Sequence, residues 1–122
     1  MAWNLNSDRP IFIQIVERIE MDIISGKYKP GDKLPSVRDF AAEAAVNPNT
    51  MQKAFTELER TGLVFSQRTT GRFITEDTSM IDELKSTLAK DKITELLSFM
   101  QQPGFQENEI LAMIGQTMKG EK

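Results

Sequence analysis

The chain has 122 residues, of which 39% are hydrophobic and 27% are charged, which suits one small globular domain with an appendage. It contains no Cys and no His, which excludes disulfides, thiolate chemistry, the usual zinc ligands and the commonest general base. The net charge is −3: residues 1–77 hold ten Lys and Arg against eleven Asp and Glu, and residues 78–122 hold five against seven. Neither part is basic, so any binding of nucleic acid requires positive charge concentrated on one face.

Targeting signals are not visible in the sequence. No apolar run is long enough to cross a bilayer, and residues 1–8 lack the basic and apolar regions of a signal peptide. We therefore expect a cytoplasmic protein without membrane contact. The residue inventory also predicts no metal and no cofactor.

The first predicted helix covers residues 10–25, where apolar residues recur at helical spacing. Ser7 or Asp8 can cap its start, and Gly26 suits its end. Residues 27–35 then form a loop that is rich in Lys and contains a Pro-Gly turn signal.

Two shorter helices are predicted next. One covers residues 36–45 and starts on Ser36 and Asp39, which match a capping box. The other covers residues 47–61 and starts on Asn47, which is followed by a proline. Its buried stripe is expected to comprise Met51, Ala54, Phe55 and Leu58. Two short helices that meet across a few residues are typical of a helix-turn-helix.

A β-hairpin follows, with strands near residues 63–67 and 72–75 and an unusual backbone angle at Gly71. Thr78 or Ser79 can cap a long helix that ends near Gln102, and a last helix runs from Glu107 to Met118 after a Pro-Gly break. The predicted fold is mainly α with a small β-hairpin wing. It is a winged helix-turn-helix in residues 1–77, followed by two C-terminal helices in residues 78–122.

Several segments in register resemble GntR-type transcription regulators: residues 10–15, 26–38, 46–55, 57–59, 62–63 and 71–74. The short region after the wing resembles the YtrA-like subgroup, whose members use a compact helical tail for dimerisation. The resemblance implies a sequence-specific DNA-binding regulator, with a repressor role, that acts as a homodimer on a palindromic operator. The recognition helix, about Asn47–Thr61, is expected in the major groove, and the wing, about Leu63–Thr75, along the minor groove.

The resemblance and the residue chemistry together indicate a set of DNA contacts. The candidates are Ser36, Arg38, Asn47, Asn49, Thr50, Gln52, Lys53, Arg68, Thr70, Gly71 and Arg72. The Arg38 guanidinium can reach a phosphate or a guanine edge with two hydrogen bonds. The alternative is a surface ion pair with Asp39 or Glu43. Ser36 is first a helix cap, and its free backbone N–H groups can also meet a phosphate.

The polar face of the third helix and the wing supply the other candidates. Asn49 and Gln52 can read adenine edges, and Lys53 can neutralise a phosphate. The alternative is a plain solvated face. Arg68 and Arg72 flank the wing tip and can enter or cross the minor groove, or they are merely solvated hairpin charges. Many family members have Arg at the positions of Pro48 and Gln52 and Gly at that of Thr69, so the operator sequence is not inherited with the resemblance.

The tail either packs onto its own domain or forms a symmetric interface. Two helices cannot bury so many large apolar residues alone, so we expect a dimer. The expected interface comprises Leu84, Leu88, Ile93, Leu97, Met100, Ile110 and Ile114. The tail methionines are expected in ordinary core rather than in a ligand groove, and no effector is identifiable. The competing function is a winged-helix protein–protein interaction module without DNA binding, whereas the residue inventory argues against an enzyme.

Overall fold

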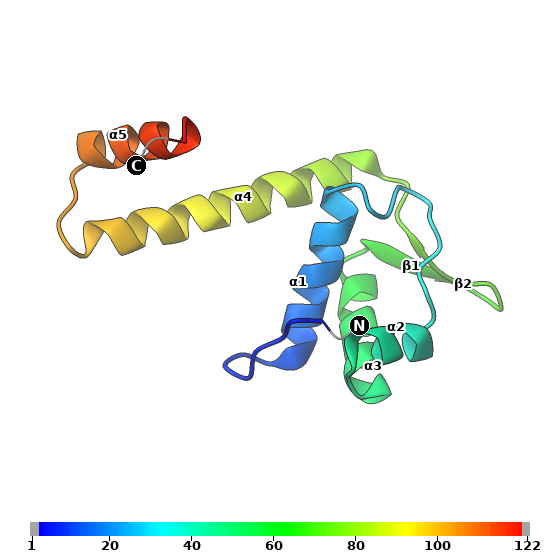
Figure 1. The fold of residues 1–122 in the computed structure, drawn as a ribbon. Helices are drawn as coiled ribbons and strands as arrows, with labels where there is room; N and C mark the ends of the chain where they lie inside the picture. The colour runs from blue at the N-terminus through cyan, green and yellow to red at the C-terminus, as the bar shows by residue number, and fades with distance from the viewer. Residues whose placement is uncertain (1–2, 121–122) are drawn as a thin grey trace. The chain divides into compact units, whose positions relative to one another are not determined.

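A computed structural model describes residues 3–120. The elements are α1 (Ile11–Ile24), α2 (Val37–Ala44), α3 (Pro48–Arg60), β1 (Val64–Gln67), β2 (Gly71–Ile74), α4 (Thr78–Gln101) and α5 (Glu107–Met118) (Figure 1). The chain forms two compact units, of which the first ends at Leu84 and the second begins at Lys85. The mainly helical fold with a two-stranded wing is confirmed, and each element lies within a few residues of its predicted position.

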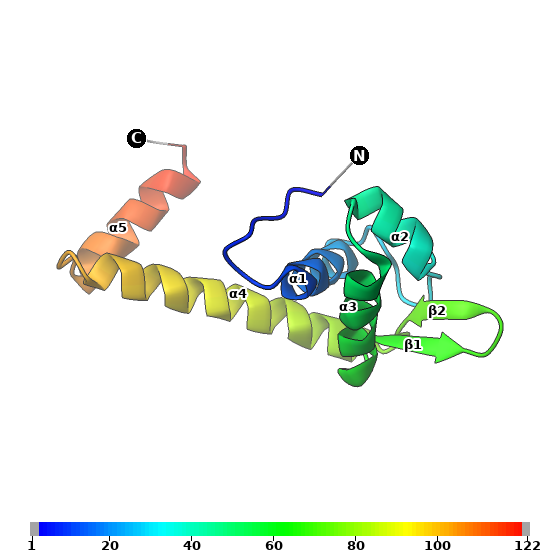
Figure 2. The ribbon, with the colours of Figure 1, turned by 90° about the horizontal axis from the view of Figure 1, so that it is seen from below.

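The core of the first unit lies around α3, which contacts both α1 and α2 and leads into β1 (Figure 2). All four residues of the predicted stripe on α3 are fully enclosed, as the helical spacing predicts. Phe40 of α2 lies at the centre of this core and makes edge-on ring contacts with Phe55 at 5.9 Å, Tyr28 at 6.3 Å and Trp3 at 5.2 Å between centroids. This packing fixes α2 and α3 relative to each other.

Trp3 is a core residue that the sequence pattern did not indicate. Its side chain is buried, the Arg18 guanidinium lies 4.7 Å from its ring centroid, and its indole Nε1 donates a hydrogen bond of 2.9 Å to Glu43. The segment that follows is held by Gln14 of α1, whose amide nitrogen donates to the Asn6 carbonyl at 2.7 Å and whose amide oxygen accepts from the Asn6 N–H at 2.9 Å. Residues 3–10 are thus part of the folded unit.

Two predicted helix caps are wrong. At α1 the cap position is occupied by Pro10 without a side-chain hydrogen bond, so Ser7 and Asp8 lie ahead of the cap position, in the segment that Gln14 binds through the Asn6 and Arg9 carbonyls. At α4 the side chain of Asp77 accepts from the Met80 N–H at 3.2 Å, one residue before the expected cap. Both errors shift a helix start by only a residue or two.

The wing is a two-stranded hairpin whose outer edge pairs with the preceding loop through one isolated antiparallel bridge, between Lys33 and Phe73. β1 and β2 pair antiparallel, with Val64 opposite Ile74 and Ser66 opposite Arg72. The Lys-rich loop then lies along the free edge of β2: the Leu34 N–H donates to the Arg72 carbonyl at 2.9 Å, and the Ile74 N–H donates to the Asp32 carbonyl at 2.8 Å. A two-stranded hairpin is marginal alone in water, so this pairing stabilises the wing.

The second unit consists of the rest of α4 and α5. The chain turns between the two helices at Gly104, which has φ of 100°. The helix α5 then starts on a capping box formed by Gln106 and Glu109. Met100 and Ile110 are buried there. Among the described residues, no helix is both long and apolar enough to span a membrane.

Candidate nucleic-acid interface

The turn between α2 and α3 is defined by local hydrogen bonds and one unusual backbone angle. Ser36 Oγ accepts from the Asp39 N–H at 3.1 Å and caps α2, and Asn47 Oδ1 accepts from the Asn49 N–H at 2.7 Å and caps α3. Ala45 adopts the left-handed conformation, with φ of 61°, which turns the chain between the helices. The first turn of α3 contains no acidic residue, so the positive end of its helix dipole is free to face a phosphate.

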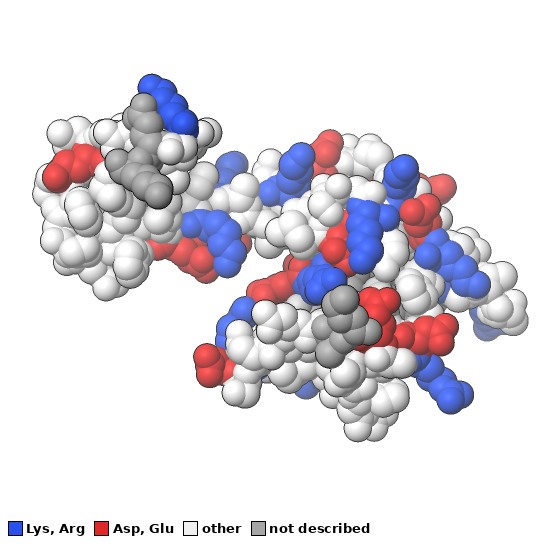
Figure 3. All heavy atoms as spheres, viewed as in Figure 1, with Lys and Arg blue, Asp and Glu red and all other residues white. Residues whose placement is uncertain are grey.

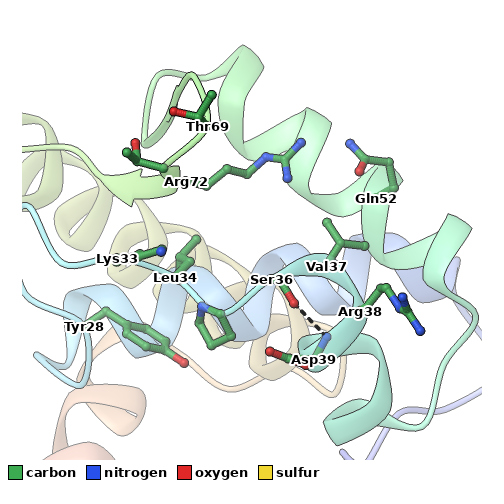
Figure 4. A pocket seen from close by; sticks show the side chains of 13 residues that line it. Tyr28, Lys33, Leu34, Ser36, Val37, Arg38, Asp39, Gln52, Thr69 and Arg72 are labelled. Atoms are coloured by element: carbon green, nitrogen blue, oxygen red, sulfur yellow. Dashed lines mark hydrogen bonds between the residues drawn. The ribbon is translucent and has the colours of Figure 1, made fainter.

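A hollow of about 870 Å³ opens between the basic loop, α2, α3 and the wing (Figure 4). Six of the predicted DNA-binding residues line it: Ser36, Arg38, Gln52, Thr70, Gly71 and Arg72. Asn47 and Thr50 line a separate hollow of about 390 Å³ beside Trp3. Asn49, Lys53 and Arg68 are exposed and do not line the larger hollow. The fold thus gathers about half of the predicted contacts around one concave surface.

Arg38 projects from the first turn of α2 and is exposed (Figure 4). Within residues 3–120 it makes no ion pair, neither with Asp39 nor with Glu43, the alternatives that the sequence offered. Glu43 instead accepts the hydrogen bond from Trp3. The guanidinium of Arg38 therefore keeps its hydrogen-bonding capacity for a ligand.

Two other predicted cations have partners inside the fold. The Lys53 ammonium lies 4.1 Å from the centroid of the Phe12 ring, a cation–π contact, although the side chain is exposed. Arg72 Nε donates to Glu59 at 2.6 Å, and its guanidinium lies 5.2 Å from the Phe55 ring centroid. Arg72 thus has an ion-pair partner inside the fold, whereas Lys53 stays exposed and keeps its charge.

The carboxylate of Glu59 is tuned by its neighbours. Partial burial acts to raise the pKa of Glu59, but hydrogen bonds from Arg72 and Ser66 outweigh it, so the pKa lies below its usual value. Glu59 is thus ionised at neutral pH and holds Arg72 as a charged pair.

The surface charge is mixed on one face of the molecule. On the face shown in Figure 3, Lys and Arg side chains alternate with Asp and Glu rather than forming one positive field. This agrees with the slight negative charge of residues 1–77. Recognition of a polyanion must therefore depend on a few placed side chains.

Lys33, Thr69 and Tyr28 also line the larger hollow, and none of them is among the DNA contacts predicted above. The Lys33 side chain lies close to Gly71: a Cβ added to Gly71 would be 2.9 Å from the Cε of Lys33. Gly71 has φ of 118°, which confirms the unusual backbone angle predicted for it. Thr69 has φ of 64° at the wing tip, in the left-handed region that residues other than Gly seldom adopt. The Lys-rich composition of the loop was the sequence feature that could have indicated Lys33, but single surface lysines are usually only solvated.

The predicted dimer-interface residues fall into three groups. Met100 and Ile110 are buried inside the second unit, and Leu84 packs against the core of the first unit. Ile93 is 56% exposed, and the remaining predicted residues are half-buried: Leu88, Leu97 and Ile114. The more exposed apolar side chains of this unit were mostly missed: Leu96, Phe99, Phe105, Leu111, Met113 and Met118.

No group of three or more residues in the described part of the chain could hold a metal ion. The site offers hydrogen-bond donors, amides and backbone N–H groups beside α3, which buries one face in the core and leaves the opposite face exposed. A helix-turn-helix with a wing and such a polar face defines a class of DNA-binding transcription regulators.

Comparison with known proteins specifies the family. The family described as bacterial regulatory proteins, gntR family, matches residues 13–74. The HTH-type regulator YhcF of Bacillus subtilis is 38% identical over 111 residues, which cover 91% of this chain and 92% of that protein. The repressor YtrA of the same organism is 40% identical over 92 residues, which cover 75% of this chain and 71% of that protein. The chain belongs to the GntR family.

Comparison with solved structures leads to the same family. A GntR family regulator from Listeria monocytogenes has a TM-score of 0.88 and 38% identity and covers 92% of this chain and 98% of its own. The DNA-binding domain of AraR, in complex with operator ORX1, has a TM-score of 0.56 and 25% identity and covers 62% of this chain and 95% of its own. The resemblance to GntR regulators and their YtrA-like members is confirmed, and the chain is a DNA-binding transcription regulator and not an enzyme.

Proposed function

We propose that this protein is a homodimeric repressor of a palindromic operator, with α3 in the major groove and the wing along the minor groove. The observation that carries the proposal is Arg38, a guanidinium without an ion-pair partner in residues 3–120, beside the polar face of α3. Support for operator binding comes from the AraR domain in complex with its operator, and support for repression comes from YtrA, which is named a repressor.

The proposed base contacts come from the exposed face of α3. Asn49, Gln52 and Thr56 lie three and four residues apart and are all exposed, so they form one stripe opposite the buried face. Amide side chains can pair with adenine through two hydrogen bonds, each such pair discriminating by about 1–3 kcal/mol. Arg38 is assigned to a phosphate or a guanine edge at the rim of the same surface.

The proposed dimer uses the apolar surface of the second unit. Seven of the ten exposed large hydrophobic residues of the described chain lie between Ile93 and Met118. An apolar hollow of about 470 Å³ between α4 and α5 is lined by Phe99, Met113 and Met118, among others. Monomeric proteins seldom expose so much apolar surface in one place, and a symmetric dimer places two α3 helices on two half-sites.

The proposal is tested by selecting duplexes from a randomised library with the wild-type protein and measuring their affinity by fluorescence anisotropy at several salt concentrations. Replacing Arg38 with Ala should cost at least about 1 kcal/mol and should flatten the salt dependence by roughly 0.9 in slope for each phosphate that is no longer neutralised. Arg60→Ala is the matched control, because Arg60 is exposed at the far end of α3 and is paired with Glu57.

Unchanged binding by Arg38→Ala would refute the role of Arg38. Failure of the wild-type protein to enrich any duplex would favour the protein–protein interaction module. Enrichment of sites without two-fold symmetry would refute the palindromic operator.

A further inference from the structure

Both strands of the wing are attached to the recognition helix through one carboxylate. Glu59 lies in the last turns of α3, and one of its oxygens accepts from Arg72 Nε at 2.6 Å. The other oxygen accepts from Ser66 Oγ at 2.8 Å. Ser66 and Arg72 are directly opposite each other in the hairpin, so Glu59 bridges the two strands at one position in their register.

Arg72 is restrained at three points. Its carbonyl accepts from the Leu34 N–H at 2.9 Å, its Nε is bonded to Glu59, and its guanidinium lies over the face of Phe55, which is fully buried. The side chains of Arg72 and Glu59 are only 26% and 30% exposed. Figure 4 shows Arg72 extended from β2 toward α3 rather than outward from the wing.

We propose that Glu59, Ser66 and Arg72 form a clamp that fixes the wing relative to the recognition helix, and that Arg72 acts in DNA binding as a positioning residue. This inference rests on the proposed function. A guanidinium that stays paired with a carboxylate does not neutralise a phosphate. It therefore displaces no counterion from the DNA. If Arg72 left Glu59 for a phosphate, a half-buried carboxylate would remain without its cation close to a polyanion, which is costly.

Arg68 is assigned instead as the wing cation that meets a phosphate. It is exposed at the hairpin tip, and no ion pair is found for it within residues 3–120. Arg68 and Arg72 are the same residue type four positions apart on one hairpin, so each serves as the matched control for the other.

The test measures the affinity of four variants for a fluorescently labelled duplex selected by the wild-type protein, over a series of salt concentrations. Arg68→Gln should make the negative slope of log affinity against log salt less steep by about 0.9 for each protomer. Arg72→Gln should leave the slope unchanged and weaken binding roughly tenfold at every salt concentration, because the wing is no longer fixed. Ser66→Ala should weaken binding in the same way, with no change of charge.

The decisive variant exchanges the two charges, Glu59→Arg with Arg72→Glu, and keeps the net charge constant. The clamp predicts that this double variant recovers most of the affinity that Arg72→Gln loses and retains the wild-type slope. A phosphate contact by Arg72 predicts the reverse, because a carboxylate would then face the DNA backbone. A reduced slope in Arg72→Gln, or no recovery in the exchanged variant, would overturn the proposal.

Thermal unfolding of the free proteins keeps the clamp testable apart from DNA binding. The exchanged variant should unfold at a higher temperature than the single variants Glu59→Arg and Arg72→Glu, since the pair is re-formed. If the wild-type protein selected no duplex, the proposed function would be refuted while this coupling would still test the clamp itself. Additive effects of the two single substitutions on unfolding would refute it.

Discussion

Phe99 provides the sharpest test of dimerisation. It lies near the C-terminal end of α4, is 69% exposed and lines the apolar hollow of the second unit. A phenylalanine side chain offers about 200 Å² of surface, so roughly 140 Å² of Phe99 remains to be covered by a second copy. At about 25 cal/mol per Å², this burial is worth about 3.5 kcal/mol in each protomer, of which Phe99→Ala should remove more than half.

A symmetric dimer contains Phe99 twice, so Phe99→Ala should weaken association by about 4 kcal/mol, or nearly a thousandfold. Sedimentation equilibrium over a range of protein concentrations measures this directly, with circular dichroism to confirm that the helices are retained. Met21→Ala is the control, because Met21 is 53% exposed but lies on α1 in the first unit. Equal association constants for wild type and Phe99→Ala would refute the proposed interface, and a wild-type protein that is monomeric at micromolar concentration would refute the dimer.

Three further predictions concern the stability of the first unit. Ala45 has φ of 61°, which costs a residue with a Cβ about 1 kcal/mol, so Ala45→Gly should raise the melting temperature in calorimetry by a few degrees; a lower value would contradict the assigned turn. Gly71→Ala should lower the free energy of unfolding in urea by about 1 kcal/mol, because φ is 118°, where a residue with a Cβ is strained; an unchanged midpoint would contradict this backbone conformation. The pKa of Glu59 is lowered from 4.5, so its pair with Arg72 stabilises the fold above that pH and is lost as the pH falls through the lowered value. The stability difference between wild type and Glu59→Gln should therefore be present at neutral pH and vanish in acid, and a pH-independent difference would argue against the pair.

The helices were predictable because their stabilising residues recur with the period of the helix. The stripe of α3, from Met51 to Leu58, is enclosed as the spacing requires. Trp3 was missed because a single aromatic residue ahead of the first helix has no period, and its partners Phe40 and Glu43 lie far along the chain. The pairing of the Lys-rich loop with β2 was also missed, because it consists of long-range backbone hydrogen bonds that leave no pattern in the side chains.

The sequence predicted where the side chains of the candidate site lie, but not which groups inside the fold they contact. Helical spacing gives the direction of each Cβ, whereas Lys53 and Arg72 have long side chains that reach back to Phe12 and Glu59. Arg38 lies in the predicted place and has no such acceptor in the described part of the chain.

Burial in the two C-terminal helices was also only partly predictable from the sequence. Its apolar residues lie on more than one side of each helix, so periodicity could not decide which would be buried within the unit. Met100 is enclosed there, whereas its neighbour Phe99 is exposed.

The ion pair of Arg72 also bears on how such a regulator would search a genome. A cation whose charge is offset by a carboxylate adds little to the sequence-independent attraction of a polyanion. Random DNA would then retain the protein only briefly, and few molecules would be lost to the vast excess of competing sites. Occupancy of an operator would depend on its own base contacts, so a small cellular supply of this protein would suffice to fill it.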